Sequence, residues 1–190
     1  MASTLRWTSA DLAALPDDGK RYEIIDGELF MSKQPHLNHQ HLCTELVYRL
    51  SKWNEEARLG FVFAAPGLIL AEDDDVVPDV VWISSDRLRI SAGQDGKLHT
   101  APELAIEVLS PGTTNERRDR DAKLKLYSRR GVQEYWIVSW LARQIEVYRR
   151  DDAQLHLSAT LLETDILESP QLPGFSCPIS ALFENLPLGE

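Results

Sequence analysis

One short segment limits what this chain can fold into more than any other. Residues 103–109 form a strand-like run that is almost wholly apolar, yet Glu107 lies within it. Side chains alternate along a strand, so Glu107 shares its face with Ala105 and Leu109 and points toward an interior or a cleft. A carboxylate there costs free energy unless it is paired or binds a cation. The segment therefore predicts either a paired or cation-binding acid in a sheet, or an edge strand whose outer face is wet.

The segments after this strand predict a helix followed by two more strands. Residues 110–112 (Ser-Pro-Gly) end the strand, because proline and glycine interrupt regular structure. A helix is expected over residues 114–130 and ends at Gly131, since glycine readily adopts the left-handed conformation that closes a helix. Residues 134–140 and 144–149 then predict a pair of strands joined by a short turn.

Two local signals occur near the start of the chain. Residues 8–12 predict a short helix whose first threonine or serine acts as the N-cap. Residues 21–25 and 28–31 are strand-like and flank Asp26-Gly27. An Asp-Gly pair supplies the positive φ angles of a type I′ turn, so this segment predicts a β-hairpin.

A longer helix is expected over residues 39–59, because its apolar residues recur at helical spacing and form one stripe. Gly60 would end it. Residues 85–100 are polar and contain glycine, and we interpret them mostly as a loop. Strands are expected in three runs between these segments: residues 60–65, 67–71 and 79–83.

The rest of the chain, rich in proline, predicts short strands and a terminal turn of helix. We find no internal repeat, low-complexity tract or linker, and 190 residues suit one domain whose core buries about 70% of the unfolded chain's surface. The expectation is a single domain over residues 1–190 of the α/β class, with mixed α+β elements.

Composition and charge exclude several classes of protein. No apolar run approaches the ~20 residues that cross a bilayer, and the N-terminus lacks a signal-peptide pattern. Neither cysteine lies in a CxxC motif, which favours a cytoplasmic protein with reduced thiols. The net charge of −10 argues against a non-specific nucleic-acid coat protein. Residues 117–130, however, hold seven Lys or Arg against two Asp, which indicates a local basic patch.

Two further groups stand out beside Glu107. Asp79 follows Pro78 and opens an apolar strand, which places a carboxylate at a sheet end; an ordinary Pro-Asp turn is the alternative. Asp119, Lys123 and Tyr127 are spaced at i, i+4 and i+8 and so share one helix face. On their own, Asp119 and Lys123 are equally consistent with a solvated ion pair worth a few tenths of a kcal/mol.

In combination, two carboxylates on neighbouring strands and a nearby lysine are the minimum set for metal-assisted phosphodiester hydrolysis. Carboxylate oxygens suit Mg²⁺, with Mn²⁺ as a possible substitute. A bound metal lowers the pKa of water and screens phosphate charge, and a lysine offsets charge in the transition state or orients the water. The basic helix would add phosphate contacts.

The sequence resembles the Uma2 family, a domain of unknown function assigned to the PD-(D/E)XK restriction-endonuclease-like superfamily. The resemblance covers nearly the whole chain in order, and the block from Glu107 to Trp136 is highly specific. It rests on these segments: residues 22–29, 39–40, 78–79, 102–111, 119–138 and 172–176.

The resemblance implies a central mixed β-sheet flanked by helices, with additional β-hairpins, and Mg²⁺-type nuclease chemistry. It makes Asp79 and Glu107 the metal ligands. The superfamily normally has a lysine two residues after the second acid, where this chain has Leu109, so Lys123 is the expected replacement. Glu23 or Glu28 would supply a further acidic ligand. Other supporting or substrate-contacting positions are Asp119, Tyr127 and His39, the last as a helix cap, a DNA contact or part of the chemistry.

Three functions remain open at this stage. The first is a Mg²⁺-dependent DNA endonuclease that acts as a homodimer, with RNA not excluded as a substrate. The second is a nuclease-fold protein that has lost turnover and acts in nucleic-acid binding or regulation. The third is a protein-interaction domain that uses its aromatic residues. The sequence has no P-loop and no Gly-x-Ser-x-Gly elbow, and no HExxH or Cys/His quartet accompanies its histidines, so zinc is not favoured.

Overall fold

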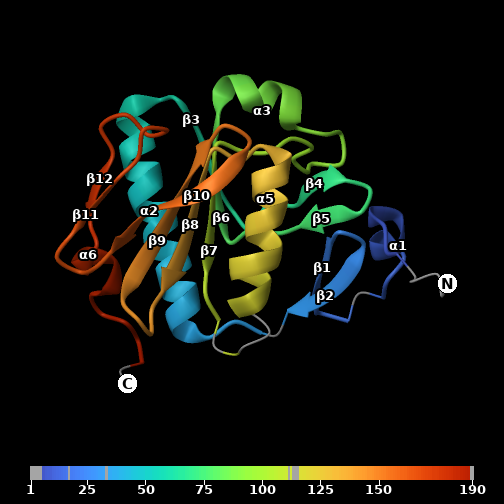
Figure 1. Cartoon of the computed structure of the whole chain (residues 1–190), viewed down its shortest axis with the longest axis horizontal. Helices are drawn as coiled ribbons and strands as arrows, with labels where there is room; N and C mark the ends of the chain where they lie inside the picture. The colour runs from blue at the N-terminus through green and yellow to red at the C-terminus, as the bar shows by residue number, and fades with distance from the viewer. Residues whose placement is uncertain (1–5, 17, 33, 111, 113–115, 189–190) are drawn as a thin grey trace.

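The computed structural model describes residues 6–16, 18–32, 34–110, 112 and 116–188 (Figure 1). Its centre is a six-stranded sheet in which neighbouring β7 and β8 run parallel and every other neighbouring pair is antiparallel. The strands, in spatial order, are β10 (Gln154–Leu161), β9 (Gln144–Asp151), β8 (Glu134–Ser139), β7 (Leu104–Val108), β6 (Val80–Ser84) and β3 (Gly60–Ala64).

Helices cover both faces of this sheet, as Figure 1 shows. On one face α2 (Leu37–Ala57) packs Leu42, Leu46 and Leu50 against the even-numbered residues of β6 and β7. On the other face α5 (Leu124–Arg130), preceded by the π-helical segment η1 (Arg118–Lys123), packs against the odd-numbered residues. β7 is buried on both faces, so the alternative of a wet edge strand around Glu107 is wrong.

A second, four-stranded sheet lies beside α5 in Figure 1. The predicted hairpin is confirmed, with Asp26 at φ 54° and Gly27 at φ 74° in its turn, as a type I′ turn requires. The strands, in spatial order, are β2 (Glu28–Ser32), β1 (Arg21–Ile25), β5 (Asp74–Val76) and β4 (Leu68–Ala71).

The central mixed sheet flanked by helices confirms the predicted fold class, but several local predictions need correction. Residues 85–91 form α3 (Ser85–Ser91) rather than a loop, because the Ser84 side chain caps the helix by accepting a hydrogen bond from the Arg87 N–H. α2 begins and ends two residues earlier than expected: His36 is its N-cap, and Arg58 closes it at φ 52° in place of Gly60.

The outer elements agree more closely with expectation. Thr8 caps α1 (Ser9–Ala13), as predicted. The C-terminal part forms β11 (Ile166–Glu168), β12 (Ser176–Pro178) and α6 (Ser180–Phe183). The predicted start of the second helix at Thr114 lies outside the described residues. No helix among those described is long and apolar enough to span a membrane.

The acidic run at residues 72–75 is partly a buried strand, which the sequence did not predict. Asp74 in β5 is fully buried. Its carboxylate accepts hydrogen bonds from the Asp26 N–H at 2.9 Å, from Arg129 at 3.0 Å and from Arg130 at 2.6 Å. These bonds join the hairpin sheet to the end of α5, and thereby fix the position of β1 relative to the central sheet.

Replacing Asp74 with alanine should lower the free energy of unfolding by about 2 kcal/mol. The Asp26 N–H and two guanidinium groups would lose the Asp74 carboxylate, but both arginines are partly exposed and keep a second acidic partner, so the loss falls below the ~3–5 kcal/mol of a fully buried pair. Urea denaturation would show a lower midpoint with an unchanged slope. Asp73→Ala, at the half-buried neighbouring residue, is the matched control, and an equal loss there would contradict the assignment.

Candidate active site

A cavity of about 730 Å³ opens where β6 begins and β7 ends. Its walls come from three layers of the fold: the central sheet, the start of α2, and the hairpin strand β1 with η1. Side chains able to carry chemistry line it as follows: Arg21, Glu23, His39, Asp79, Glu107 and Lys123.

Asp79 stands directly before β6. Val80 pairs with Ile106 across β6 and β7, so the next position outward places Asp79 opposite Glu107. Its Oδ2 accepts hydrogen bonds from the Val108 N–H at 2.9 Å and from His39 Nε2 at 3.1 Å. Although burial raises the pKa of Asp79, the hydrogen bond from His39 and the charge of Lys123 lower it overall. Asp79 is therefore an anchored, ionised carboxylate at the cavity.

Glu107 is the buried acid that the sequence singled out, and its side chain is 2% exposed. Its Oε1 accepts hydrogen bonds from Lys123 Nζ at 2.8 Å and from the Tyr127 hydroxyl at 2.9 Å. Burial raises the pKa of Glu107 well above its ordinary value, and the nearby charges of Asp79 and Asp119 raise it further, against the effect of Lys123. This carboxylate lies where additional positive charge would stabilise its ionised form.

Lys123 is buried from η1, with 1% of its side chain exposed. Its Nζ lies 2.8 Å from both Glu107 Oε1 and Glu23 Oε1, and 4.0 Å from Asp119 Oδ1. Burial lowers the pKa of Lys123, but Glu107, Glu23 and Asp119 raise it overall, so the ammonium stays charged. The alternative of a solvated Asp119–Lys123 pair is wrong, since both side chains are buried.

Glu23 is the acid that sequence reasoning left undecided against Glu28. It lies in β1 with 1% of its side chain exposed, and its Oε1 also accepts the Val77 N–H at 2.9 Å. Despite burial, the charges of Lys123 and Arg118 lower its pKa. Glu28, by contrast, is exposed at the start of β2 and does not line the cavity. A single acid within the apolar run of β1 is the same signal that identified Glu107.

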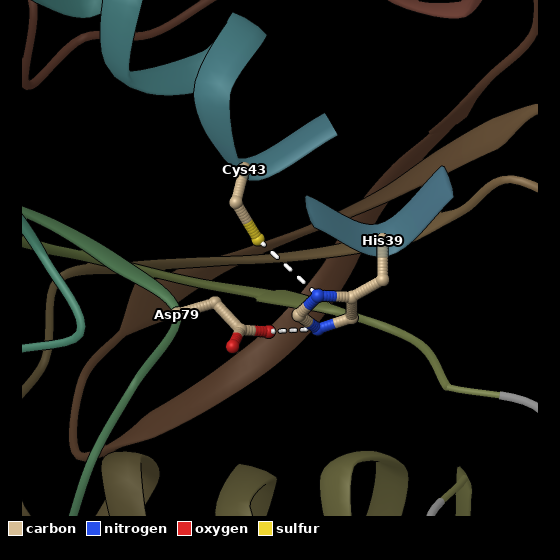
Figure 2. Close-up of side chains that lie close together, drawn as sticks. All are labelled: His39, Cys43 and Asp79. Atoms are coloured by element: carbon tan, nitrogen blue, oxygen red, sulfur yellow. Dashed lines mark hydrogen bonds and ion pairs between the residues drawn. The ribbon is translucent and has the colours of Figure 1, made fainter. Parts of the chain in front are cut away.

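Figure 2 shows His39 and Cys43 from α2 directed toward Asp79. The His39 imidazole lies between them: Nε2 meets Asp79 at 3.1 Å, and Nδ1 meets Cys43 Sγ at 3.6 Å. His39 is not the helix cap, because His36 takes that position. Cys43 was absent from the sequence prediction; its spacing of four residues from His39 is the signal that would have found it.

Most of the cations in the predicted basic patch on residues 117–130 form ion pairs within the protein, although Arg117, Lys125 and Arg129 are exposed. Lys123 is buried, Arg120 pairs with Glu146, and Arg129 and Arg130 pair with Asp74. The cavity rim offers other cations: Arg21 is 43% exposed with its Nη1 3.8 Å from Asp79 Oδ1, and Lys20 is 52% exposed. Exposed cations at the rim of the cavity therefore come from β1 and the residue before it.

Comparison with solved structures supports the fold. The structure is similar to "Crystal structure of a putative nuclease belonging to DUF820 from Anabaena variabilis ATCC 29413", with a TM-score of 0.73 and 20% identity over 93% of this chain and 97% of that one. A weaker likeness is to the type IIG restriction endonuclease BpuSI, with a TM-score of 0.41 and 16% identity over 82% of this chain and 17% of that one. No curated protein matches the sequence.

The sequence itself matches one family model over most of its length. The match covers residues 9–180, and the model is described as "Putative restriction endonuclease". It includes every residue of the cavity described above. The chain therefore belongs to the Uma2 family, as the resemblance in its sequence predicted.

Proposed function

We propose that this protein is a Mg²⁺-dependent endonuclease that hydrolyses phosphodiester bonds of DNA. The observation that carries the proposal is one juxtaposition. Asp79 and Glu107 face the same cavity from neighbouring strands, and Lys123 Nζ lies 2.8 Å from Glu107. Family membership supports the reaction class, while the metal and the nucleic acid are inferred from the residues.

The residues around the cavity fit a hard divalent cation. Asp79 and Glu107 offer carboxylate oxygens, which Mg²⁺ prefers, and it is usually held by one or two such groups plus waters and substrate phosphate. Burial, together with the nearby charges of Asp79 and Asp119, raises the pKa of Glu107, and a bound cation would favour its ionised form. When bound, Mg²⁺ would lower the pKa of a water ligand and screen the charge of the phosphate.

Lys123 supplies the positive charge that the superfamily places two residues after the second acid. That position is Leu109, which is buried in the apolar cluster under α5. Lys123 reaches the same side of the sheet from η1, where Glu23 holds its ammonium against Glu107. In this position Lys123 offsets negative charge developing on the phosphate or orients the attacking water. Glu23 acts through Lys123 as a positioning residue.

Arg21 is the proposed phosphate contact at the rim. Arg21→Ala should weaken DNA binding several-fold and reduce the steepness of log K against log salt by about 0.9, since one fewer counterion is released. Fluorescence anisotropy at several salt concentrations measures both quantities. Arg89→Ala, at an exposed arginine of α3 away from the cavity, should change neither. An unchanged salt slope in the Arg21 variant would exclude this contact.

The proposed activity is tested by nicking of supercoiled plasmid with Mg²⁺, Mn²⁺ or EDTA. We expect metal-dependent nicking that disappears in Asp79→Ala and in Glu107→Ala. A single-stranded RNA is the comparison substrate. Cleavage of RNA alone would move the substrate class to RNA. Folded protein that binds DNA but cuts neither substrate with either ion would support the alternative of a non-catalytic nucleic-acid-binding protein.

We propose further that two copies act together, because symmetric sites cut both strands of a duplex most simply. The chain has a mass of 21.5 kDa, and light scattering of a dimer would show twice that value. At enzyme concentrations where this mass is found, supercoiled plasmid should be converted to linear product. Accumulation of nicked circles, together with a monomeric mass, would overturn the dimer without affecting the proposed chemistry.

A further inference from the structure

We propose that His39, Cys43 and Asp79 form a second cation site, selective for a thiophilic ion such as Zn²⁺, which shares Asp79 with the oxygen-ligand site. The three side chains offer one potential ligand atom each, and these atoms lie within 4.8 Å of one another. The inference concerns which ion this face of the cavity binds, and only its consequence for activity rests on the proposed function.

The fold brings the three groups together from two separate segments. His39 and Cys43 are four residues apart in α2, so they project from the same helix face, and Asp79 meets them from the entrance of β6. The imidazole edge that carries both ring nitrogens faces the thiol and the carboxylate in Figure 2. An ion bound by all three groups would replace the contacts that the imidazole makes to the thiol and the carboxylate.

The distances agree with tetrahedral zinc. Bond lengths of about 2.0–2.1 Å to nitrogen and about 2.3 Å to sulfur place those two ligand atoms roughly 3.6 Å apart. His39 Nδ1 and Cys43 Sγ are 3.6 Å apart here. All three ligand atoms lie within 4.8 Å of one another, so the most distant pair would have to approach by about 1 Å to bind one zinc ion. Three protein ligands leave the fourth position to water, as in catalytic rather than structural zinc sites.

The donor set distinguishes this site from the one proposed for Mg²⁺. A thiolate and an imidazole suit Zn²⁺ and other borderline or soft ions, whereas Mg²⁺ takes carboxylate and water oxygens. Asp79 and Glu107 suit the hard ion; Asp79 with His39 and Cys43 suits the soft one. The ion that binds therefore depends on whether Asp79 coordinates it together with Glu107 or together with His39 and Cys43.

An ion has a path to this site. His39 and Asp79 both line the cavity, and Cys43 lies one helical turn deeper, half-buried against the core. Burial and the charges of Asp79 and Glu107 raise the pKa of the Cys43 thiol, so it is protonated when no metal is bound. Coordination forms the S–metal bond as the S–H bond breaks, and the proton leaves to solvent.

The site is tested with Co²⁺, a spectroscopic substitute for Zn²⁺, on the full chain kept reduced by a phosphine. Binding through Cys43 should give a thiolate-to-cobalt charge-transfer band in the near ultraviolet, which one equivalent of Zn²⁺ removes. Cys43→Ser should lose the band. The chain's other cysteine provides the matched control: Cys177 is buried near α6, and Cys177→Ala should retain the band. Circular dichroism confirms that each variant is folded.

Two results would overturn the site: no charge-transfer band in the folded wild-type protein, or a band that persists in Cys43→Ser and disappears in Cys177→Ala. For Cys43→Ser we expect Zn²⁺ affinity to fall by more than ~10–100-fold, which is the loss that follows removal of a residue that contacts a ligand but not the metal itself. These spectra do not depend on nuclease activity, so the site stands or falls separately from the proposed function.

If the proposed function also holds, Zn²⁺ should inhibit Mg²⁺-dependent nicking by occupying Asp79. Measured relative to its own activity with Mg²⁺ alone, Cys43→Ser should require at least tenfold more Zn²⁺ for half inhibition than the wild type, since the thiolate ligand is lost while Asp79 remains. Equal inhibition of both proteins would place the inhibitory ion elsewhere. Absence of nicking with a positive Co²⁺ spectrum would contradict the nuclease proposal alone.

Discussion

Lys123→Met should reduce nicking by at least about 10²–10³-fold, the loss typical of removing a preorganised charge that stabilises a transition state. It should also lower the free energy of unfolding by about 3–5 kcal/mol, because removing one partner leaves buried charges uncompensated. Lys123 Nζ is shared by Glu23 and Glu107, with Asp119 at 4.0 Å, and all of these side chains are at most 2% exposed. The effect on stability is measured by urea denaturation in EDTA.

A second variant separates the two effects. In Lys123→Met/Glu23→Gln the lost positive charge is matched by the loss of one negative charge, so most of the stability should return. Activity should not return, because no ammonium remains beside Glu107. Recovery of nicking in the double variant would show that Lys123 acts only as a structural counter-charge. Retention of activity by the folded single variant would exclude Lys123 from the chemistry.

Glu107→Gln should reduce nicking without reducing stability. Nicking should fall by at least about 10²-fold, which is at or above the loss seen when a residue that supports a metal ligand is removed. The free energy of unfolding in EDTA should be unchanged or increased. The amide oxygen can still accept from Lys123 and Tyr127, as Glu107 Oε1 does. Neutralisation also removes the repulsion from Asp79 and Asp119, which together with burial raises the pKa of Glu107. Under the proposed function, this carboxylate lowers stability when no metal is bound and is retained because it would bind the ion.

The pH dependence of this difference follows from the same pKa. A carboxyl whose folded-state pKa is raised binds its proton more tightly in the folded state, so its contribution to stability falls as pH rises above about 4.3, the ordinary pKa of glutamate. When no divalent ion is present, the stability of Glu107→Gln relative to wild type should therefore increase as the pH rises from about 4.3 toward the raised pKa of Glu107. A difference that is constant with pH would contradict the raised pKa.

Added Mg²⁺ should reverse the order of the two proteins. An ion that binds only the folded state raises stability by RT ln(1 + [L]/Kd), which is about 2.7 kcal/mol at one hundred times Kd. Wild type should gain from Mg²⁺ in thermal unfolding, and Glu107→Gln should gain much less. An equal gain in both proteins would show that the stabilising ion does not use Glu107.

Local sequence signals were sufficient for much of the fold. The Asp26-Gly27 turn, the strand containing Glu107 and the glycine end of α5 each depend on a few neighbouring residues, and each was predicted. α3 was missed because a short, partly exposed helix has little apolar periodicity, and its cap at Ser84 was the better signal. The buried strand around Asp74 was missed because an acidic run normally indicates solvent exposure.

The sequence by itself predicted the candidate residues: the cost of burying charge singled out Glu107 in its apolar strand, and the family resemblance added Asp79 and Lys123. Only the tertiary structure decided their partners. Glu23 reaches Lys123 from a different sheet, and Cys43 and His39 reach Asp79 from the helix on the opposite face. Contacts between segments far apart in the chain depend on how the layers of the fold pack together. The spacing of residues within one segment does not predict these contacts.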